Sequence, residues 1–159
     1  MSAGYLAEDQ GDLADATAAF TQIHQQDHDQ SHYSAAALVG LGWVALRDED
    51  WSAARQYFAA AFPLIEQLET APQALEALAG VAHWQAQAGQ PEQALTLVGL
   101  VQQHPSSYQE SKDRLADLVA ELQARLSPGR VQAALARGQA AELWDTVAAM
   151  RSQLDEGRA

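Results

Sequence analysis

Apolar residues return every three or four positions along most of the chain, which is the spacing of one face of an α-helix. The run that ends near residue 126 is typical, with apolar residues at Leu115, Leu118, Val119, Leu122 and Leu126. β-Branched residues are sparse and do not alternate with polar residues over any strand-length run. The pattern therefore predicts an all-α fold of roughly nine helices joined by short turns.

Cap and turn residues indicate where several of these helices end. The predicted N-terminal caps are Thr70, Ser107 and Ser127, and the predicted C-terminal stops are Gly89 and Gly138. A proline follows two of the caps within the first helical turn, where its missing N–H costs no hydrogen bond. These positions divide the chain into short helices of similar length.

The last predicted helix carries a continuous apolar stripe. Its members are Leu143, Trp144, Val147, Met150 and Leu154. We expect this stripe to pack on the preceding helix and to close the end of the structure. The alternative is that the chain ends mediate self-association into a homo-oligomer.

Three segments share one internal spacing, which indicates a repeat. They begin at Gly11, Glu49 and Gly89, so successive segments lie 38 and 40 residues apart. In each, an alanine lies five positions after the start and a larger apolar residue nine positions after it. A period of this length is typical of helical hairpins that stack side by side.

The repeat resembles the tetratricopeptide repeat (TPR). The second unit matches best, through Leu38, Leu41, Gly42, Asp50, Trp51, Ala54, Phe58 and Ala61, with Glu49 in place of the turn glycine. The third has Val81 and Ala82 where a leucine-glycine pair is expected. The resemblance implies an α-α superhelix of TPR-like helical hairpins with a C-terminal helical cap. Its repeats are residues 1–30, 31–70 and 71–104, and its cap is residues 105–159. The first unit begins inside a helix, so we expect the chain to be part of a longer protein.

From residue 75 onward the chain also resembles the C-terminal repeat region of bacterial LuxR-type and SARP-type signal-transduction ATPase regulators. The matching stretches are 75–82, 88–94, 97–99 and 126–143. In that family the repeats sense an effector or a partner, while separate ATPase and DNA-binding domains act on the signal. The sequence contains neither a GxxxxGK[ST] loop nor a plausible helix-turn-helix, so neither activity is expected here.

The first helices of stacked hairpins would line a concave face, and matching their register predicts a groove. The groove residues are Tyr5, Trp43 and His83 at one level, with Glu8, Asp9, Arg47 and Gln87 one turn further along. Aromatic rings beside charged groups suit a protein or peptide partner. The alternative is that the aromatic side chains only pack against neighbouring helices.

Charge narrows the classes of partner. The chain has a net charge of −12, and residues 1–104 carry −11 of it. This acidity opposes binding to nucleic acid or to an anionic membrane, and it favours a basic partner segment. The 34 alanines strengthen the helical prediction, and the absence of cysteine excludes thiolate chemistry.

Three histidines recur every fourth residue at His24, His28 and His32. On one continuous helix they would share a face that could bind zinc or nickel. The segment lacks apolar positions and lies where the repeat needs a turn, so we expect a polar loop without a metal.

These patterns predict a cytoplasmic, non-catalytic module that binds a protein or peptide and needs no cofactor. The serines lack a nucleophile elbow, and the carboxylates lie on polar helix faces, so no catalytic residues are expected. Two alternatives stay open. A sensor of a small-molecule effector would need an enclosed, largely apolar pocket, and a structural self-association unit would bind no ligand.

Overall fold

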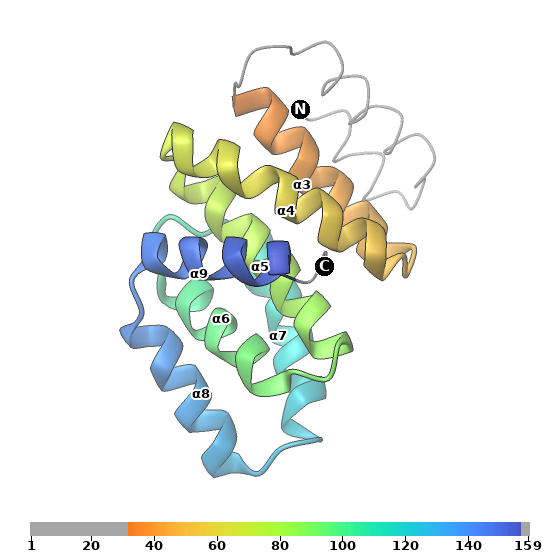
Figure 1. Ribbon diagram of the computed structural model, residues 1–159. Helices are drawn as coiled ribbons and strands as arrows, with labels where there is room; N and C mark the ends of the chain where they lie inside the picture. The colour runs from red at the N-terminus through yellow and green to blue at the C-terminus, as the bar shows by residue number, and fades with distance from the viewer. Residues whose placement is uncertain (1–31, 157–159) are drawn as a thin grey trace.

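The computed structural model describes residues 32–156, and within that range the protein consists of seven α-helices without a β-strand (Figure 1). The helices are α3 (His32–Arg47), α4 (Trp51–Leu68), α5 (Ala71–Gln87), α6 (Pro91–Gln103), α7 (Gln109–Gln123), α8 (Pro128–Ala140) and α9 (Leu143–Glu156). The predicted all-α class is confirmed for this part of the chain. The predicted partial first repeat, residues 1–30, lies outside the described residues. No described helix is both long and apolar enough to cross a membrane.

Local capping explains several helix ends. The Asp50 side chain accepts a hydrogen bond from a backbone N–H at the start of α4, at 3.1 Å, and Ser127 does the same for α8 at 3.4 Å. Gly89 has φ +82° in the turn after α5, the left-handed conformation that glycine adopts without a steric penalty. Glu49 holds the equivalent position after α3 with φ +58°. The structure therefore uses Glu49 in the role that the repeat gives to glycine.

Two of the expected caps differ from the prediction. Thr70 precedes α5 as predicted, but its side chain makes no capping hydrogen bond. Ser107 is not the cap of α7, because its hydroxyl donates to the backbone oxygen of Val101 at 2.6 Å. The helix begins two residues later, at Gln109. A serine near a helix start can instead donate its hydroxyl to a backbone oxygen at the end of the previous helix. The sequence pattern is the same in both cases.

The core of the hairpins is built around Phe58 of α4, which is fully buried. Its ring tip lies against Gly42 of α3 and Gly80 of α5. A Cβ atom added to Gly42 would lie 2.6 Å from the Cζ atom of the ring, and one added to Gly80 would lie 2.8 Å from its Cε1 atom. Both distances are far below van der Waals contact, so the two glycines allow three helices to meet on one ring. In the third unit the glycine in this contact is Gly80, and Val81 and Ala82 follow it.

A second close approach joins α6 and α8. A Cβ atom on Gly99 of α6 would clash with the backbone oxygen of Leu135, and one on Gly138 of α8 would clash with the backbone oxygen of Thr96. The two backbones therefore touch directly. The prediction that Gly138 ends its helix is wrong, because α8 continues to Ala140 and Gly138 is buried at the crossing.

The last helix, α9, packs on α4 and α5. Val147 and Leu154 of its apolar stripe are buried. Two arginines join it to α4: Arg55 donates to the backbone oxygen of Leu154 at 2.9 Å, and Arg151 pairs with Glu66 at 3.1 Å. The expected packing of this helix on its predecessor is wrong, because α8 packs on α6 instead.

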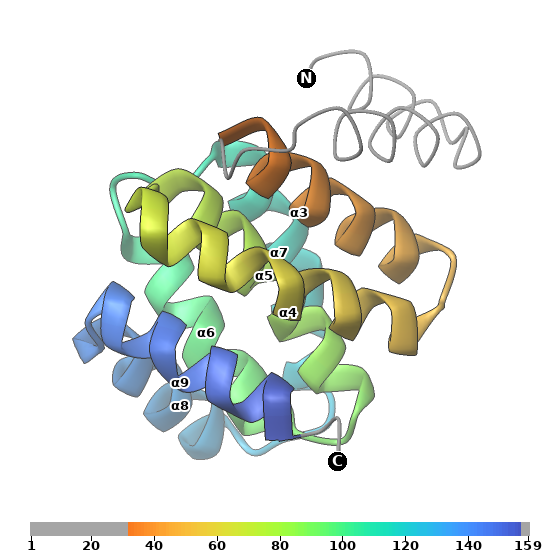
Figure 2. The ribbon, with the colours of Figure 1, turned by 45° about the horizontal axis from the view of Figure 1, so that its top comes forward.

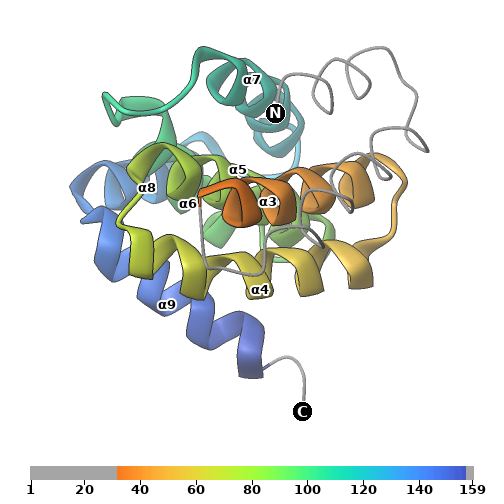
Figure 3. The ribbon, with the colours of Figure 1, turned by 90° about the horizontal axis from the view of Figure 1, so that it is seen from above.

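Helices α7 and α9 lie on opposite sides of the group formed by α3 to α6. Figures 2 and 3 show α7 on one side of that group and α9 on the other. The contacts agree, since α7 packs on α5 and α6 while α9 packs on α4 and α5. The structure therefore has two separate faces on which side chains from several helices converge.

Candidate functional site

Helices α3, α5 and α7 line a groove made of two adjoining hollows of about 430 and 220 Å³. We call this the α3–α5–α7 groove. Its residues are Trp43, Leu46, Arg47, Trp51, His83, Ala86, Gln87, Arg114, Asp117, Leu118, Glu121 and Arg125. Trp43, Arg47 and His83 belong to both hollows and therefore lie at the centre of the groove.

The structure brings together the four predicted groove residues that it describes. Trp43 and His83 lie 40 residues apart in the sequence, as do Arg47 and Gln87, and all four line the groove. Each pair holds the same position in consecutive units, because α3 and α5 pack side by side. The other three predicted members, Tyr5, Glu8 and Asp9, lie outside the described residues.

Trp43 forms a packed wall of the groove, since its side chain is only 4% exposed. Its Nε1 atom donates to the backbone oxygen of Glu76 at 3.2 Å, which fixes the indole against α5. The His83 ring meets the indole edge-on, with centroids 5.4 Å apart and an interplanar angle of 70°. The Arg114 guanidinium lies 4.6 Å from the ring centroid, at cation–π distance. A partner would therefore meet the groups around Trp43 more than the indole itself.

His83 is the titratable group at the centre of the groove. Its Nε2 atom is buried and has no hydrogen-bond partner. Burial is the main cause that lowers the pKa of His83, and the charge of Arg114 lowers it further. The carboxylates of Glu121 and Asp117 act in the opposite direction. Since the usual histidine pKa is 6.5 and that of His83 is lower, the ring is mainly neutral at pH 7. A neutral imidazole has one nitrogen that donates a hydrogen bond and one that accepts.

The charged rim of the groove comes mainly from α7. Arg114 pairs with Glu110 at 2.7 Å, and Arg125 pairs with Glu121 at 2.7 Å, both across one turn of helix. Arg125 and Glu121 are both more than half exposed, and such a pair contributes little to stability, so these two side chains can turn towards a partner at small cost. The described lining holds Arg47, Arg114 and Arg125 against Asp117 and Glu121. The expected preference for a basic segment stays a prediction.

The contribution of α7 was missing from the sequence prediction. The charged residues of this helix recur at a spacing of four, which marks one helical face. By itself, that spacing predicts only a polar helix face. It does not tell which side of the fold the face lines, because that depends on how α7 docks on α5 and α6.

Metal binding has no support among residues 32–156, where no three His, Asp or Glu side chains lie close enough to hold an ion. His24 and His28 lie outside that range, so the expected polar loop stays untested. Comparison of the chain with protein-family models, with curated proteins and with solved structures finds no match.

Proposed function

We propose that this chain is a TPR-like, non-catalytic repeat module that binds a protein or peptide segment in the α3–α5–α7 groove. One observation carries the proposal: side chains at the same position of consecutive units, Trp43 with His83 and Arg47 with Gln87, converge on one groove. Such convergence is how stacked hairpins present a continuous surface to an extended ligand. A superhelix of these hairpins would lengthen the groove with further units.

We keep the expected basic partner on the net charge of the chain, because the groove lining itself carries three arginines and two carboxylates. Gln87 is exposed at the rim, where its amide can pair with a peptide backbone, and Asp117 supplies a carboxylate. The net charge of −12 attracts a basic segment over longer distances. Raised salt should therefore slow association and weaken the complex.

The resemblance to bacterial signal-transduction ATPase regulators gives this binding role a setting. We propose that the module is the sensor or scaffold part of a larger cytoplasmic regulator of transcription. Partner binding by the repeats would then be passed to ATPase and DNA-binding domains elsewhere in the regulator.

Peptide selection tests the proposal. A library of random peptides displayed on phage is selected on the immobilised protein, and the enriched peptides are synthesised for affinity measurement by fluorescence anisotropy. Arg47→Ala and Gln87→Ala change exposed groove side chains and should each weaken binding about 5-fold to 10-fold, the loss of one hydrogen bond. Arg137→Ala and Gln132→Ala make the same changes on α8, away from the groove, and should leave the affinity unchanged. Equal affinities for the groove and control variants would contradict the proposal.

Self-association through the chain ends is the structural alternative. It predicts a mass that rises with protein concentration in sedimentation equilibrium. The apolar stripe of α9 is largely used within the chain, since Val147 and Leu154 are buried against the core. A monomer at all concentrations that still binds the selected peptides would favour the groove.

A further inference from the structure

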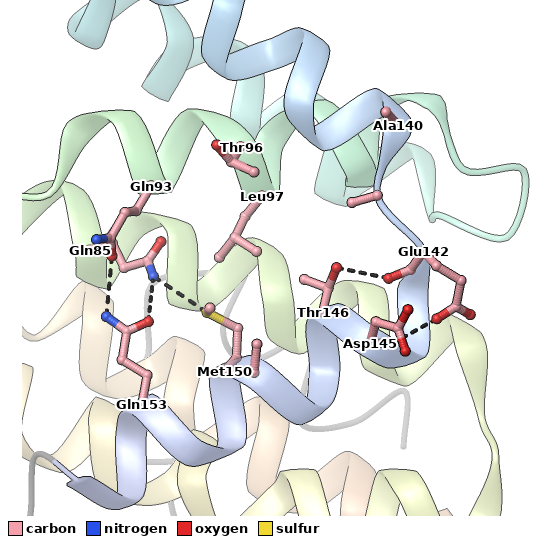
Figure 4. Close-up of a pocket in the computed structure, with 12 residues that line it drawn as sticks. Gln85, Gln93, Thr96, Leu97, Ala140, Glu142, Asp145, Thr146, Met150 and Gln153 are labelled. Carbon is pink, nitrogen blue, oxygen red and sulfur yellow. Dashed lines mark hydrogen bonds between the residues drawn. The ribbon is translucent and has the colours of Figure 1, made fainter.

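A second cleft, of about 620 Å³, lies between α5, α6 and α9 (Figure 4). Figure 3 shows α9 on the side of the fold away from α7. Figure 4 shows glutamine side chains at one end of this cleft and the carboxylates of Glu142 and Asp145 at the other. Leu97 and Met150 lie between the two ends. The volume is within the range of small-molecule sites. We call this region the α9 cleft.

The glutamine end is an ordered network of amides. Gln153 donates through Nε2 to the side-chain oxygens of Gln90, at 3.3 Å, and Gln93, at 3.2 Å. The oxygen of the Gln153 amide accepts from Gln85 Nε2 at 3.5 Å. Gln85 Nε2 also lies 3.4 Å from the sulfur of Met150. Because a thioether sulfur accepts hydrogen bonds but does not donate them, Met150 favours the nitrogen of the Gln85 amide on its side, which leaves the amide oxygen on the other side.

This orientation leaves the Gln85 oxygen without a donor. Gln85 is 1% exposed, and its Oε1 atom is buried with no hydrogen-bond partner. A buried acceptor without a donor destabilises the folded state. Such an atom therefore indicates that another molecule donates a hydrogen bond to it. Gln85 lines the α9 cleft, so a bound molecule that displaces the side chains covering its oxygen can donate to it.

The other end of the cleft selects for positive charge. The Glu142 side chain accepts a hydrogen bond from the Asp145 backbone N–H at 2.7 Å, which holds its carboxylate at the start of α9. Asp145 lies in the first turn of the helix, with its exposed carboxylate at the same end of the cleft (Figure 4). The described residues that line the cleft include no lysine or arginine. An anionic ligand would find no partner there, whereas an ammonium group would find two carboxylates.

We propose that the α9 cleft binds an aliphatic diamine. One ammonium group lies at Glu142 and Asp145, the carbon chain crosses the apolar surface of Leu97 and Met150, and the second amine donates to Gln85 Oε1. The buried acceptor and the two carboxylates require donors at both ends, and the surface between them requires carbon. This site is independent of the α3–α5–α7 groove, because no residue lines both.

Thermal unfolding and isothermal titration calorimetry test the site, with putrescine and cadaverine as probes at constant ionic strength. Either diamine should raise the melting temperature by about 2–4 °C at saturation, since it binds only the folded state. Gln85→Met removes the amide at similar volume. It also removes the donor to Gln153 Oε1, so urea unfolding of the unliganded variant is measured beside binding. It should weaken diamine binding at least about 10-fold. Asp145→Asn should weaken binding severalfold while leaving the fold intact.

Matched controls separate this site from general attraction to an acidic protein. Gln132→Met makes the same substitution on the exposed face of α8 and should bind the diamines as the unchanged protein does. Pentylamine lacks the second amine and should bind about 10-fold more weakly than cadaverine. Glutarate, an aliphatic dianion of similar length, should not bind.

Several results would overturn the proposal. These are no diamine binding up to millimolar concentration, equal affinity of Gln85→Met and the unchanged protein, or equal binding of glutarate and cadaverine. A crystal structure grown with cadaverine that holds only a water molecule at Gln85 Oε1 would also overturn it. Loss of binding to the groove peptides would not bear on it, because the two sites share no residue.

Discussion

The packing of Phe58 against two glycines makes a quantitative prediction about Gly80. A Cβ atom at this position would lie 2.8 and 2.9 Å from two ring atoms and closer still to the ring tip, whereas ordinary contact begins at 3.4 Å. The ring would have to retreat by roughly 1 Å, and Gly42 closes off the same end of it. Retreat therefore requires α4 to shift away from α3 and α5, or the ring to leave its rotamer.

The expected cost of Gly80→Ala follows from two opposing effects. Alanine is favoured over glycine inside a helix by about 1 kcal/mol. Overpacking of a well-packed core costs about 1–3 kcal/mol, and the full burial of Phe58 leaves little room for relief. We expect a net loss of about 1–2 kcal/mol in the free energy of unfolding. For a chain of 159 residues this corresponds to a melting temperature lower by about 2–8 °C.

Urea unfolding followed by far-UV circular dichroism measures this loss, with Gly129→Ala as the matched control. Gly129 lies in the first turn of α8, and an added Cβ atom there meets nothing within 4 Å. Its replacement should be neutral or should stabilise by up to about 1 kcal/mol. Gly80→Ala should cost less in a Phe58→Leu background, where the ring is absent. The proposed contact between Phe58 and Gly80 would be refuted if Gly80→Ala were as stable as the unchanged protein. It would also be refuted if the losses of stability from Gly80→Ala and Phe58→Leu were strictly additive.

Three further predictions follow from the same structure. Glu49 and Gly89 both have left-handed backbone conformations. Glu49→Gly should therefore leave the free energy of unfolding unchanged or raise it by up to about 1 kcal/mol, whereas Gly89→Ala should lower it by about 1 kcal/mol. Chemical denaturation measures both variants, and a Glu49→Gly variant less stable than Gly89→Ala would contradict the equivalence of the two positions. Burial and a nearby guanidinium lower the pKa of His83, so its contribution to stability is complete above about pH 6.5 and is lost as the pH falls from there towards the lowered value. His83→Gln should therefore reduce the loss of stability as the pH falls below about 6.5 in urea titrations at each pH, and an unchanged slope would argue against this assignment. Gly138→Ala should cost about 2–3 kcal/mol, since the added methyl group meets backbone at the crossing of α6 and α8, and an unchanged urea midpoint would show that the two helices do not touch there.

Local chemistry in the sequence was enough to predict several helix ends. A proline in the first turn, a serine cap and a glycine with positive φ each act within four residues, so they act almost independently of the rest of the fold. This is why Ser127 and Gly89 lie where they were expected. The repeat period also placed Trp43 with His83 and Arg47 with Gln87, because equal spacing gives equal positions when hairpins pack side by side.

Rules of the same kind failed where a residue had a partner in another helix. Gly138 reads as a helix stop in the sequence, but the backbone of α6 lies against it and the helix continues. Ser107 reads as a cap, but the end of α6 uses its hydroxyl. In both cases a contact with a separate helix outweighed a local preference of about 1 kcal/mol.

The sequence by itself determined that residues 32–156 are mostly helical and which residues of α3 and α5 hold equivalent positions, because these follow from periodicity and local backbone chemistry. Only the tertiary structure decided that α9 returns to α4, where Arg55 meets an oxygen 99 residues further along the chain. It alone brought the charged face of α7 to the groove and buried the Gln85 amide beside the α9 cleft. The physical reason is that docking depends on which helix faces fit each other, and no residue pattern within one helix records its partner.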